Sequence, residues 1–253
     1  GGALQRADLA TTSGRAAALA AVRRREPVVL SHAWELLPGA KQWTVRRLQE
    51  HFEASRSPCD VLRAPQERQK YTYYFENLAD RDMLEEGRRA EPCNKALRLS
   101  FTDFVRLTRD DERHRYYLQT SLFACDRGVQ GLRQAQVPNA ELKGQLDEAM
   151  EGALWRELSE ALGHFDWFRS QLFVGPVGTL GCAHFDQYDN FFLQVRGSKR
   201  FLLFDPRVGA RCLYPFPVHH PFDQRARVDL ESPDVSQFPR LAEAYGAGAE
   251  ALL

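Results

Sequence analysis

The stretch that decides the fold is 182–204, which reads CAHFDQYDNFFLQVRGSKRFLLF. It is rich in aromatic residues and is interrupted by one Gly-containing turn. With the residues just upstream, it predicts strands at 170–174, 183–186, 190–195 and 199–204 and a turn at 196–198. Because short strands at close intervals are typical of a sandwich or barrel, we expect a β core from residue 169 onward.

Within this stretch, His184 and Asp186 are separated by one position. In a strand, residues two apart point to the same face, so the imidazole and the carboxylate could meet at one metal ion. These two ligands, completed by one more histidine, form the site of non-haem Fe(II) oxygenases. A His-x-Asp pair alone is common, and the alternative is a hydrogen-bonded rim histidine beside a turn aspartate.

Three further residues are expected near this pair. Asn190 and Phe192 keep the strand parity of His184. Across the turn, Lys199 is predicted to begin an antiparallel strand and to point its cation into the same cavity, which would suit a dicarboxylate co-substrate. The alternative for Lys199 is an ordinary solvated lysine on a sheet edge.

The remainder of the chain predicts helices and strands in alternation, without an internal repeat. Helices are expected near 17–22, at 43–52 with Thr44 as cap, at 99–107 with Ser100 as cap, and at 141–162. Strands are expected at 27–30, 71–75 and 115–120, a long loop at 205–240, and a return to strand or helix at 241–253.

Composition excludes several classes of protein. The 253 residues carry 34 basic and 34 acidic side chains, so neither disorder nor a large nucleic-acid footprint is indicated. The apolar runs are too short to span a membrane, which predicts a soluble protein. The five cysteines form no CxxC, which indicates free thiols in the cytoplasm or nucleus rather than disulfides or a zinc knuckle. The opening Gly1-Gly2-Ala3 fits a fragment or a processed start.

Several segments together resemble a known family. They are HFDQYDNFFLQVRGSKRFLLF, CLYPFPVHHPFDQ, VDLESPD and FP, and more weakly EPVVL, FTDFV and YYLQTSL upstream. The combined pattern is similar to the JmjC-type Fe(II)/2-oxoglutarate dioxygenases, most of all to their asparaginyl-hydroxylase branch, which acts on the hypoxia-inducible factor. The resemblance runs from about residue 26 to the end of the chain.

The resemblance implies a fold and a domain organisation. The fold would be mainly β with flanking helices (α+β), a double-stranded β-helix of the jelly-roll, cupin-like JmjC type, incomplete at the C-terminus. A polar segment, 1–25, would precede one domain at 26–253. That domain would comprise an N-terminal α/β part at 26–168 and a β-helix core at 169–253 that lacks its last strands.

It also implies roles for individual residues. His184 and Asp186 would be the catalytic Fe(II) ligands, and Lys199 and Tyr117 would bind the distal carboxylate of 2-oxoglutarate. Taken alone, Tyr117 would more often be a core tyrosine. The co-substrate pocket would further include Asn190, Phe192 and Thr179, and the contacts to a peptide substrate would be Gln119, Gln224 and Arg225, residue types that are usually polar surface positions.

The sequence departs from the family pattern at two places. Gly181 stands where the family places a threonine that helps to hold 2-oxoglutarate, and Thr179 lies two positions earlier. This difference would weaken or re-route co-substrate binding. In the peptide-contact loop, Gln224 and Arg225 occur in the opposite order to the family, which affects the expected partner specificity.

The third metal ligand is not found in the sequence. His219 and His220 lie in a proline-rich loop, which argues against a regular strand, and they are excluded as ligands. The other histidines, His32, His51, His114 and His164, all precede the motif, whereas the family draws its last histidine from a later strand. We therefore expect a truncated oxygenase whose third ligand, closing strand and dimerisation helices lie beyond Leu253.

The leading hypothesis is a 2-oxoglutarate-dependent protein hydroxylase that uses Fe(II), with ascorbate as reductant. It would hydroxylate asparagine in a partner protein, such as an activation segment or an ankyrin repeat. Lysyl hydroxylation or demethylation stays open within the same family. The alternatives from other classes are an inactive cupin-like module that binds peptides and a small-molecule cupin enzyme.

Overall fold

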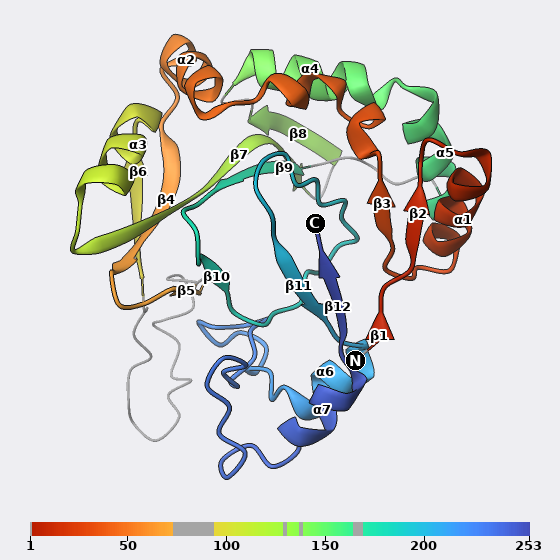
Figure 1. Ribbon diagram of the computed structural model, residues 1–253. Coiled ribbons are helices and arrows are strands. Elements are labelled where there is room, and N and C mark those ends of the chain that lie inside the picture. The colour runs from red at the N-terminus through yellow and green to blue at the C-terminus, as the bar shows by residue number, and fades with distance from the viewer. Residues whose placement is uncertain (1, 73–93, 129–130, 137–138, 164–168) are drawn as a thin grey trace.

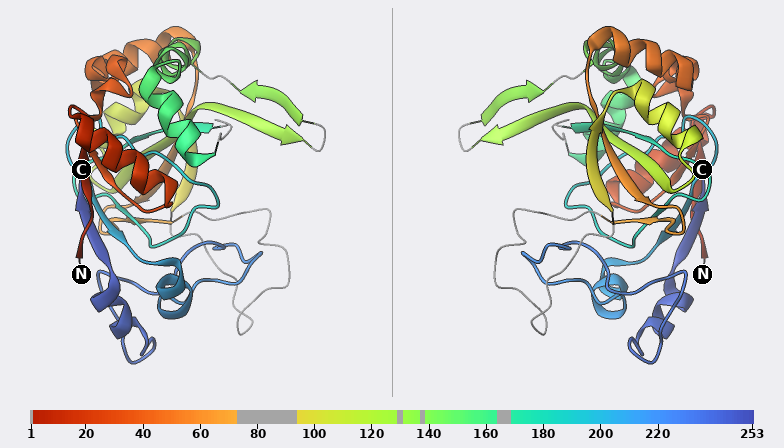
Figure 2. Two further views of the ribbon diagram at one scale, coloured as in Figure 1. Left: turned by 90° about the vertical axis from the view of Figure 1, so that its right-hand side faces the viewer. Right: turned by 90° about the vertical axis from the view of Figure 1, so that its left-hand side faces the viewer.

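The computed structural model describes residues 2–72, 94–128, 131–136, 139–163 and 169–253 (Figure 1). Its largest sheet is antiparallel and contains β4 (Cys59–Pro65), β6 (Lys95–Leu99), β7 (His114–Gly128), β8 (Gly131–Gln136) and β9 (Arg169–Val174). The long strand β7 pairs with β4, β8 and β9 and so forms the spine of this sheet. Figure 2 shows β8 and the end of β7 projecting from the body of the molecule.

Three small sheets complete the β structure. β11 (Arg200–Leu203) pairs antiparallel with β12 (Ala249–Leu252), and β1 (Gly2–Ala3) adds to β12 in parallel. Two further parallel pairs join β2 (Arg6–Asp8) to β3 (Val29–Ser31) and β5 (Lys70–Tyr71) to β10 (Leu180–Gly181). The observed class is α+β, with one large antiparallel sheet and three small sheets, and within the described residues these sheets do not close into a barrel.

Helices cover the outside of the sheets. They are α1 (Thr12–Arg23), α2 (Val45–Ser55), α3 (Phe101–Asp110), α4 (Ala140–Met150), α5 (Ala153–Leu162), α6 (Pro206–Cys212) and α7 (Leu241–Ala247), with short 3-10 turns at Ala33–Glu35 and Pro38–Gln42. Figure 1 shows α2, α3 and α4 along one side of the large sheet, and α6 and α7 together below it. No helix in the described part of the chain is long and apolar enough to cross a bilayer.

The main core lies between the large sheet and the helices α2, α3 and α4. Phe52, Phe101 and Phe104 from the helices pack with Tyr116 and Leu118 from β7, and all five are nearly inaccessible to solvent. The alternation of β7 sends Tyr116 and Leu118 into this core. The intervening residues of β7 therefore face the opposite side of the sheet.

The two predicted N-caps are confirmed. The Thr44 hydroxyl accepts a hydrogen bond from the Arg47 amide (3.1 Å) at the start of α2, and the Ser100 hydroxyl accepts one from the Asp103 amide (3.0 Å) at the start of α3. The predicted single helix at 141–162 is wrong, because the chain is extended at Gly152 between α4 and α5. Glycine has a low helix propensity, which accounts for the break at this position.

The predicted strands at 183–186 and 190–195 are also wrong. Neither segment forms a ladder within the described residues, apart from one isolated bridge at His184. The expected hairpin across 196–198 does not form either, since Lys199 exchanges backbone hydrogen bonds with Leu253 (3.0 and 3.1 Å). The pattern correctly predicts a turn, with Gly197 at a φ of 73°, but not the partner of the next strand.

Candidate functional site

His184 and Asp186 approach each other although they do not lie on a regular strand. The His184 Nε2 and an Asp186 carboxylate oxygen, Oδ1, are 3.9 Å apart. The other ring nitrogen, Nδ1, lies 2.7 Å from the Cys182 carbonyl, which can only accept a hydrogen bond. In the neutral imidazole this contact places the proton on Nδ1 and leaves the Nε2 lone pair toward Asp186, which is the tautomer of histidine that binds a metal through Nε2.

A hydrogen bond from Asn190 orients the Asp186 carboxylate. Its amide Nδ2 donates to Asp186 Oδ2 (2.9 Å), which leaves Oδ1 facing the imidazole. The sequence interpretation placed Asn190 in the co-substrate pocket, whereas here it contacts a candidate metal ligand. Support of a ligating carboxylate by a neighbouring donor is common in metal sites, where such donors orient the ligand.

A distant loop braces this pair through the backbone. His184 and Arg225 form an isolated antiparallel bridge. The Phe185 amide donates to the Gln224 carbonyl (3.0 Å), and the Ala226 amide donates to the Ala183 carbonyl (2.8 Å). The structure thus brings Gln224 and Arg225, predicted as substrate contacts, directly beside the candidate metal ligands.

Lys199 lies in a cage of three phenylalanine rings. Its Nζ is 4.8 Å from the ring centroid of Phe192, 5.4 Å from that of Phe201 and 5.6 Å from that of Phe173. The ammonium group donates to the Tyr117 hydroxyl at 3.5 Å, and no described carboxylate pairs with it. Burial without an anion lowers the pKa of Lys199 from its ordinary value. An anionic ligand would restore the balance of charge here.

Tyr117 and Gln119 share the face of β7 opposite the main core. The Tyr117 side chain is buried, and its ring packs on Tyr71 and Phe173 with centroids 5.3 and 6.1 Å away. Gln119 pairs across the ladder with Phe173, and its buried Oε1 has no hydrogen-bond partner within the described residues. Sequence reasoning placed Lys199, Tyr117 and Phe192 in one pocket, but missed Phe173, Phe201 and Tyr71. Strand parity with Lys199 could have indicated Phe201, which lies two positions later in the chain.

Thr179 and Gly181 lie on the segment that leads to His184. The Thr179 hydroxyl donates to the Pro176 carbonyl (2.7 Å), so its proton is already used within the turn. A Cβ atom added at Gly181 would meet nothing within 4 Å. The space for a larger residue at Gly181 is therefore present, and the role of Thr179 in binding co-substrate stays a prediction.

The His220 side chain is engaged within its own loop, whereas the exclusion of His219 as a metal ligand stays a prediction. His220 is buried between Phe216 and Phe222, with ring centroids 4.5 and 5.9 Å away, and its Nδ1 accepts a hydrogen bond from the Phe222 amide (3.0 Å). Among the described residues, no three His, Cys, Asp or Glu side chains are grouped to hold a metal ion. His164 lies outside those residues.

The donors that are present fit part of an Fe(II) site. One imidazole nitrogen and one carboxylate oxygen face each other, and each is held by a hydrogen bond from its far side. This is the imidazole and carboxylate chemistry that non-haem iron uses. The third protein ligand of such a site does not lie among the described residues.

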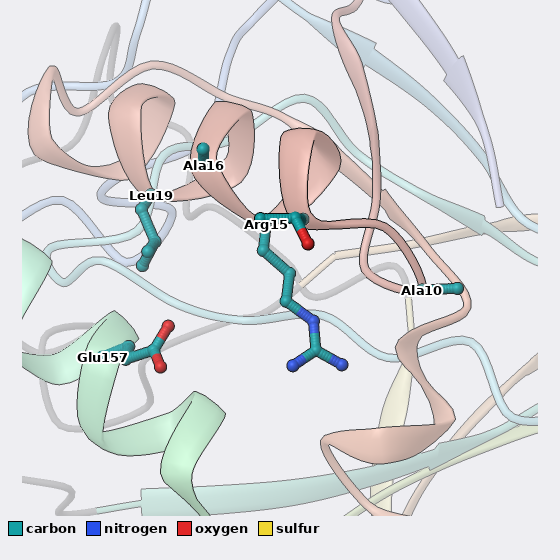
Figure 3. Close-up of a pocket in the computed structure, with 6 residues that line it drawn as sticks. Ala10, Arg15, Ala16, Leu19 and Glu157 are labelled. Atoms are coloured by element: carbon teal, nitrogen blue, oxygen red, sulfur yellow. The ribbon is translucent and has the colours of Figure 1, made fainter.

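A separate hollow of about 400 Å³ lies between α1 and α5 (Figure 3). It is lined by Ala10, Thr12, Arg15, Ala16, Leu19 and Glu157. Arg15 is already engaged, since it donates to the Leu9 carbonyl (2.6 Å) and pairs with Glu35 (2.6 Å). None of the predicted site residues lines this hollow, so it is not the candidate site.

Comparison with known proteins places the chain in a family. It is 25% identical over 222 residues to tRNA wybutosine-synthesizing protein 5 of Gallus gallus, covering 87% of this chain and 59% of that protein. It is 39% identical over 66 residues to JmjC domain-containing protein D of Dictyostelium discoideum, covering 26% and 14% of the two chains. It is 36% identical over 73 residues to lysine-specific demethylase 8 of Xenopus tropicalis, covering 28% and 15%.

In each comparison the match spans less than two thirds of the relative's own length. None of these three relatives is an asparaginyl hydroxylase of the hypoxia pathway by name, so that finer resemblance gains no support from them. The family described as Cupin-like domain matches residues 16–251, which is most of this chain. The chain therefore belongs to the Cupin-like domain family.

Proposed function

We propose that this protein is an Fe(II)- and 2-oxoglutarate-dependent oxygenase. The observation that carries the proposal is the pairing of His184 Nε2 with Asp186 Oδ1 at 3.9 Å, with each side chain anchored on its far side. Family membership and the JmjC and demethylase names of two relatives add support. Lys199, which pairs with no carboxylate among the described residues, supplies the second element, a place for an anionic co-substrate.

Each residue has a physical role in this proposal. His184 and Asp186 would hold the iron, which when bound supplies the activation of dioxygen, with ascorbate as its reductant. Lys199 and Tyr117 would bind the distal carboxylate of 2-oxoglutarate, the cation by charge and the phenol by donating its proton. The phenylalanine rings around Lys199 keep water away from the ion pair, which strengthens it.

The finer proposal is hydroxylation of a protein, at asparagine or a related side chain. Gln224 and Arg225 bridge to the metal-binding segment, and Gln119 offers an unused amide oxygen, so these residues would contact a peptide with its target side chain near the iron. Partners would be activation segments or ankyrin repeats in the cytoplasm or nucleus. The alternative within the same reaction class is hydroxylation or demethylation of lysine, in keeping with the name of one relative.

A second candidate substrate is RNA, because the relative whose match spans 87% of this chain is named for synthesis of a tRNA base. The balance of 34 basic and 34 acidic residues does not favour it over a protein, since RNA binding draws on an excess of basic side chains. Incubating the protein with peptide pools and with total tRNA, and measuring the gain of one oxygen by mass spectrometry, separates the two.

The general proposal is tested by following succinate release from 2-oxoglutarate with Fe(II), ascorbate and oxygen. Lys199→Met should raise the concentration of 2-oxoglutarate needed for half-maximal release by about 10- to 100-fold, because a hydrogen bond to a charged group is lost. Methionine keeps the packing against the three rings. Lys41→Met, at an exposed position, is the matched control and should behave as the wild type. Equal values for both variants would contradict the role of Lys199.

Co-substrate affinity should also depend on pH in a particular range. Because the pKa of Lys199 is lowered from 10.5, the ordinary value for lysine, the free protein loses this positive charge at a lower pH than an ordinary lysine would as the pH rises. Only the protonated form attracts a carboxylate, so affinity should fall as pH rises through the lowered pKa. Without ligand, the unfolded state binds the proton more tightly, so stability should rise with pH between the lowered pKa and 10.5. Calorimetric titration with 2-oxoglutarate across this pH range measures whether the affinity falls. An affinity that stays constant up to pH 10.5 would contradict the prediction.

A further inference from the structure

Three consecutive residues of the segment 184–192, which carries the candidate metal ligands, contact three different parts of the molecule. Asn190 donates a hydrogen bond to Asp186, and the Phe192 ring belongs to the aromatic cage of the candidate site. Between them, Phe191 packs against a second hydrophobic core, apart from the main one. Because the three residues share one backbone, the position of Phe191 helps to determine where both of its neighbours lie.

The second core belongs to elements other than those that carry the candidate site. It is formed mainly by α1, α5, β2 and β3, which Figure 1 shows together on one side of the molecule. Its buried members in the described chain lie between residues 7 and 158, so Phe191 joins this core from a distant part of the sequence. The segment 184–192 is thereby attached to a group of elements that contributes no predicted site residue.

Trp155, on α5, holds the ring of Phe191 in a defined orientation. The two rings meet edge to face, with centroids 4.9 Å apart and planes at 88°, which is a favoured arrangement of an aromatic pair. The Trp155 Nε1 donates to the Leu36 carbonyl (2.6 Å), and Leu36 is itself buried in the second core. The hydrogen bond fixes the indole, and the indole in turn limits the movement of the Phe191 ring.

A second link joins the same segment to the end of α1. Arg25, two residues after α1, forms an ion pair with Asp189. Their side chains are 63% and 59% exposed, and exposed ion pairs contribute little because water and salt screen them. We therefore expect the aromatic contact of Phe191 to contribute more to holding the segment than this ion pair does.

The hydrogen bond that orients the Asp186 carboxylate depends on such an anchor. Asp186 and Asn190 are both exposed, so water competes for the donor and the acceptor of this bond. The bond persists only while the backbone keeps the Asn190 amide within reach of the carboxylate. Functional side chains must be held to within about 0.5 Å, and two exposed side chains do not provide that precision by themselves.

We propose that Phe191, held by Trp155, is a positioning residue for the metal site, because it keeps Asn190 where that amide orients Asp186. This inference rests on the proposed oxygenase function and adds to it a residue that acts through another. The competing explanation is that Phe191 serves only the stability of the second core.

Calorimetric titration with Mn(II) in place of Fe(II) tests the inference. We expect Phe191→Ala to weaken Mn(II) binding about tenfold, the lower end of the range for losing a group that orients a metal ligand. Asn190→Ala should weaken it to a similar extent. In the double variant, the Phe191 replacement should add nothing further, because its effect acts through Asn190. Fully additive losses would overturn the inference.

Leu9→Ala is the matched control for a loss of stability. Leu9 is fully buried in the same second core and lies three residues before α1, whereas Arg25 and its link to the segment lie after α1. The variant opens a cavity in this core and should lower the temperature of unfolding, as Phe191→Ala should, and yet bind Mn(II) as the wild type does. Equal weakening of Mn(II) binding in Leu9→Ala and Phe191→Ala would show that only stability is affected and would overturn the inference.

The remaining outcomes separate this inference from the proposed function. If the wild type binds no Mn(II), the oxygenase proposal fails and the inference fails with it. If Asn190→Ala loses affinity for Mn(II) and Phe191→Ala does not, only the anchor is overturned. Trp155→Leu removes the edge-to-face contact and leaves Phe191 in place, so it should weaken binding in the same direction. This variant decides the matter if Phe191→Ala does not fold.

Discussion

Replacing His184 with asparagine is expected to abolish the Fe(II)-dependent release of succinate and to weaken Fe(II) binding by at least about 100-fold. Loss of a residue that only supports a ligand already costs 10- to 100-fold in such sites, and His184 offers the lone pair itself. The effect should be large here because the described residues contribute only one other ligand, Asp186. Metal affinity is measured by calorimetry with Fe(II) or Mn(II) under anaerobic conditions.

The matched control is His219→Asn. His219 is exposed and lies in a left-handed backbone conformation, with a φ of 70°, which asparagine tolerates. We expect this variant to bind metal and to release succinate as the wild type does. If His184→Asn keeps full metal affinity, or if His219→Asn loses it, the assignment of the metal ligand fails.

Replacing Phe101 with alanine is expected to lower the free energy of unfolding by about 3–5 kcal/mol, the range for truncating a buried aromatic side chain. Phe101 is 1% exposed and is the first residue of α3. Its ring stacks on Phe52 with centroids 5.2 Å apart and meets the edge of Phe104 at 5.9 Å. Alanine would leave a cavity where α2, α3 and the large sheet meet. Urea denaturation followed by circular dichroism measures the change.

Phe185→Ala provides the comparison for this truncation. The Phe185 side chain is 53% exposed, so its removal should change the free energy of unfolding by less than about 0.5 kcal/mol. If the two variants lose equal free energy of unfolding, packing in the main core does not contribute more to stability than an exposed side chain does. A changed urea dependence in Phe101→Ala would instead indicate an altered unfolded state.

How well the fold could be predicted depends on how far apart the interacting residues are in sequence. The caps at Thr44 and Ser100 were predictable because a cap and its partner lie within one helical turn. The strands at 183–186 and 190–195 were not, because an extended segment becomes a strand only when another edge pairs with it. Lys199 illustrates this, since its partner is Leu253 rather than the preceding segment.

The same distinction holds for the candidate site. The spacing of His184 and Asp186 correctly indicated that they approach each other, but the strand that was expected to align them is absent, and Cys182, Asn190 and the loop at 224–226 hold them instead. Phe173 and Tyr71 gave no sequence signal, because they reach Tyr117 only through the pairing of β7 with β9 and the packing of β5.

The backbone pairing of Lys199 with Leu253 links the proposed co-substrate site to the stability of the sheet formed by β1, β11 and β12. Lys199 precedes β11, which pairs with β12, and β12 in turn carries β1. Any ligand that anchors Lys199 therefore stabilises the sheet in which the first and last strands meet. Fraying of that sheet would, by the same reciprocity, release the cation from its aromatic cage and lower the affinity for the ligand.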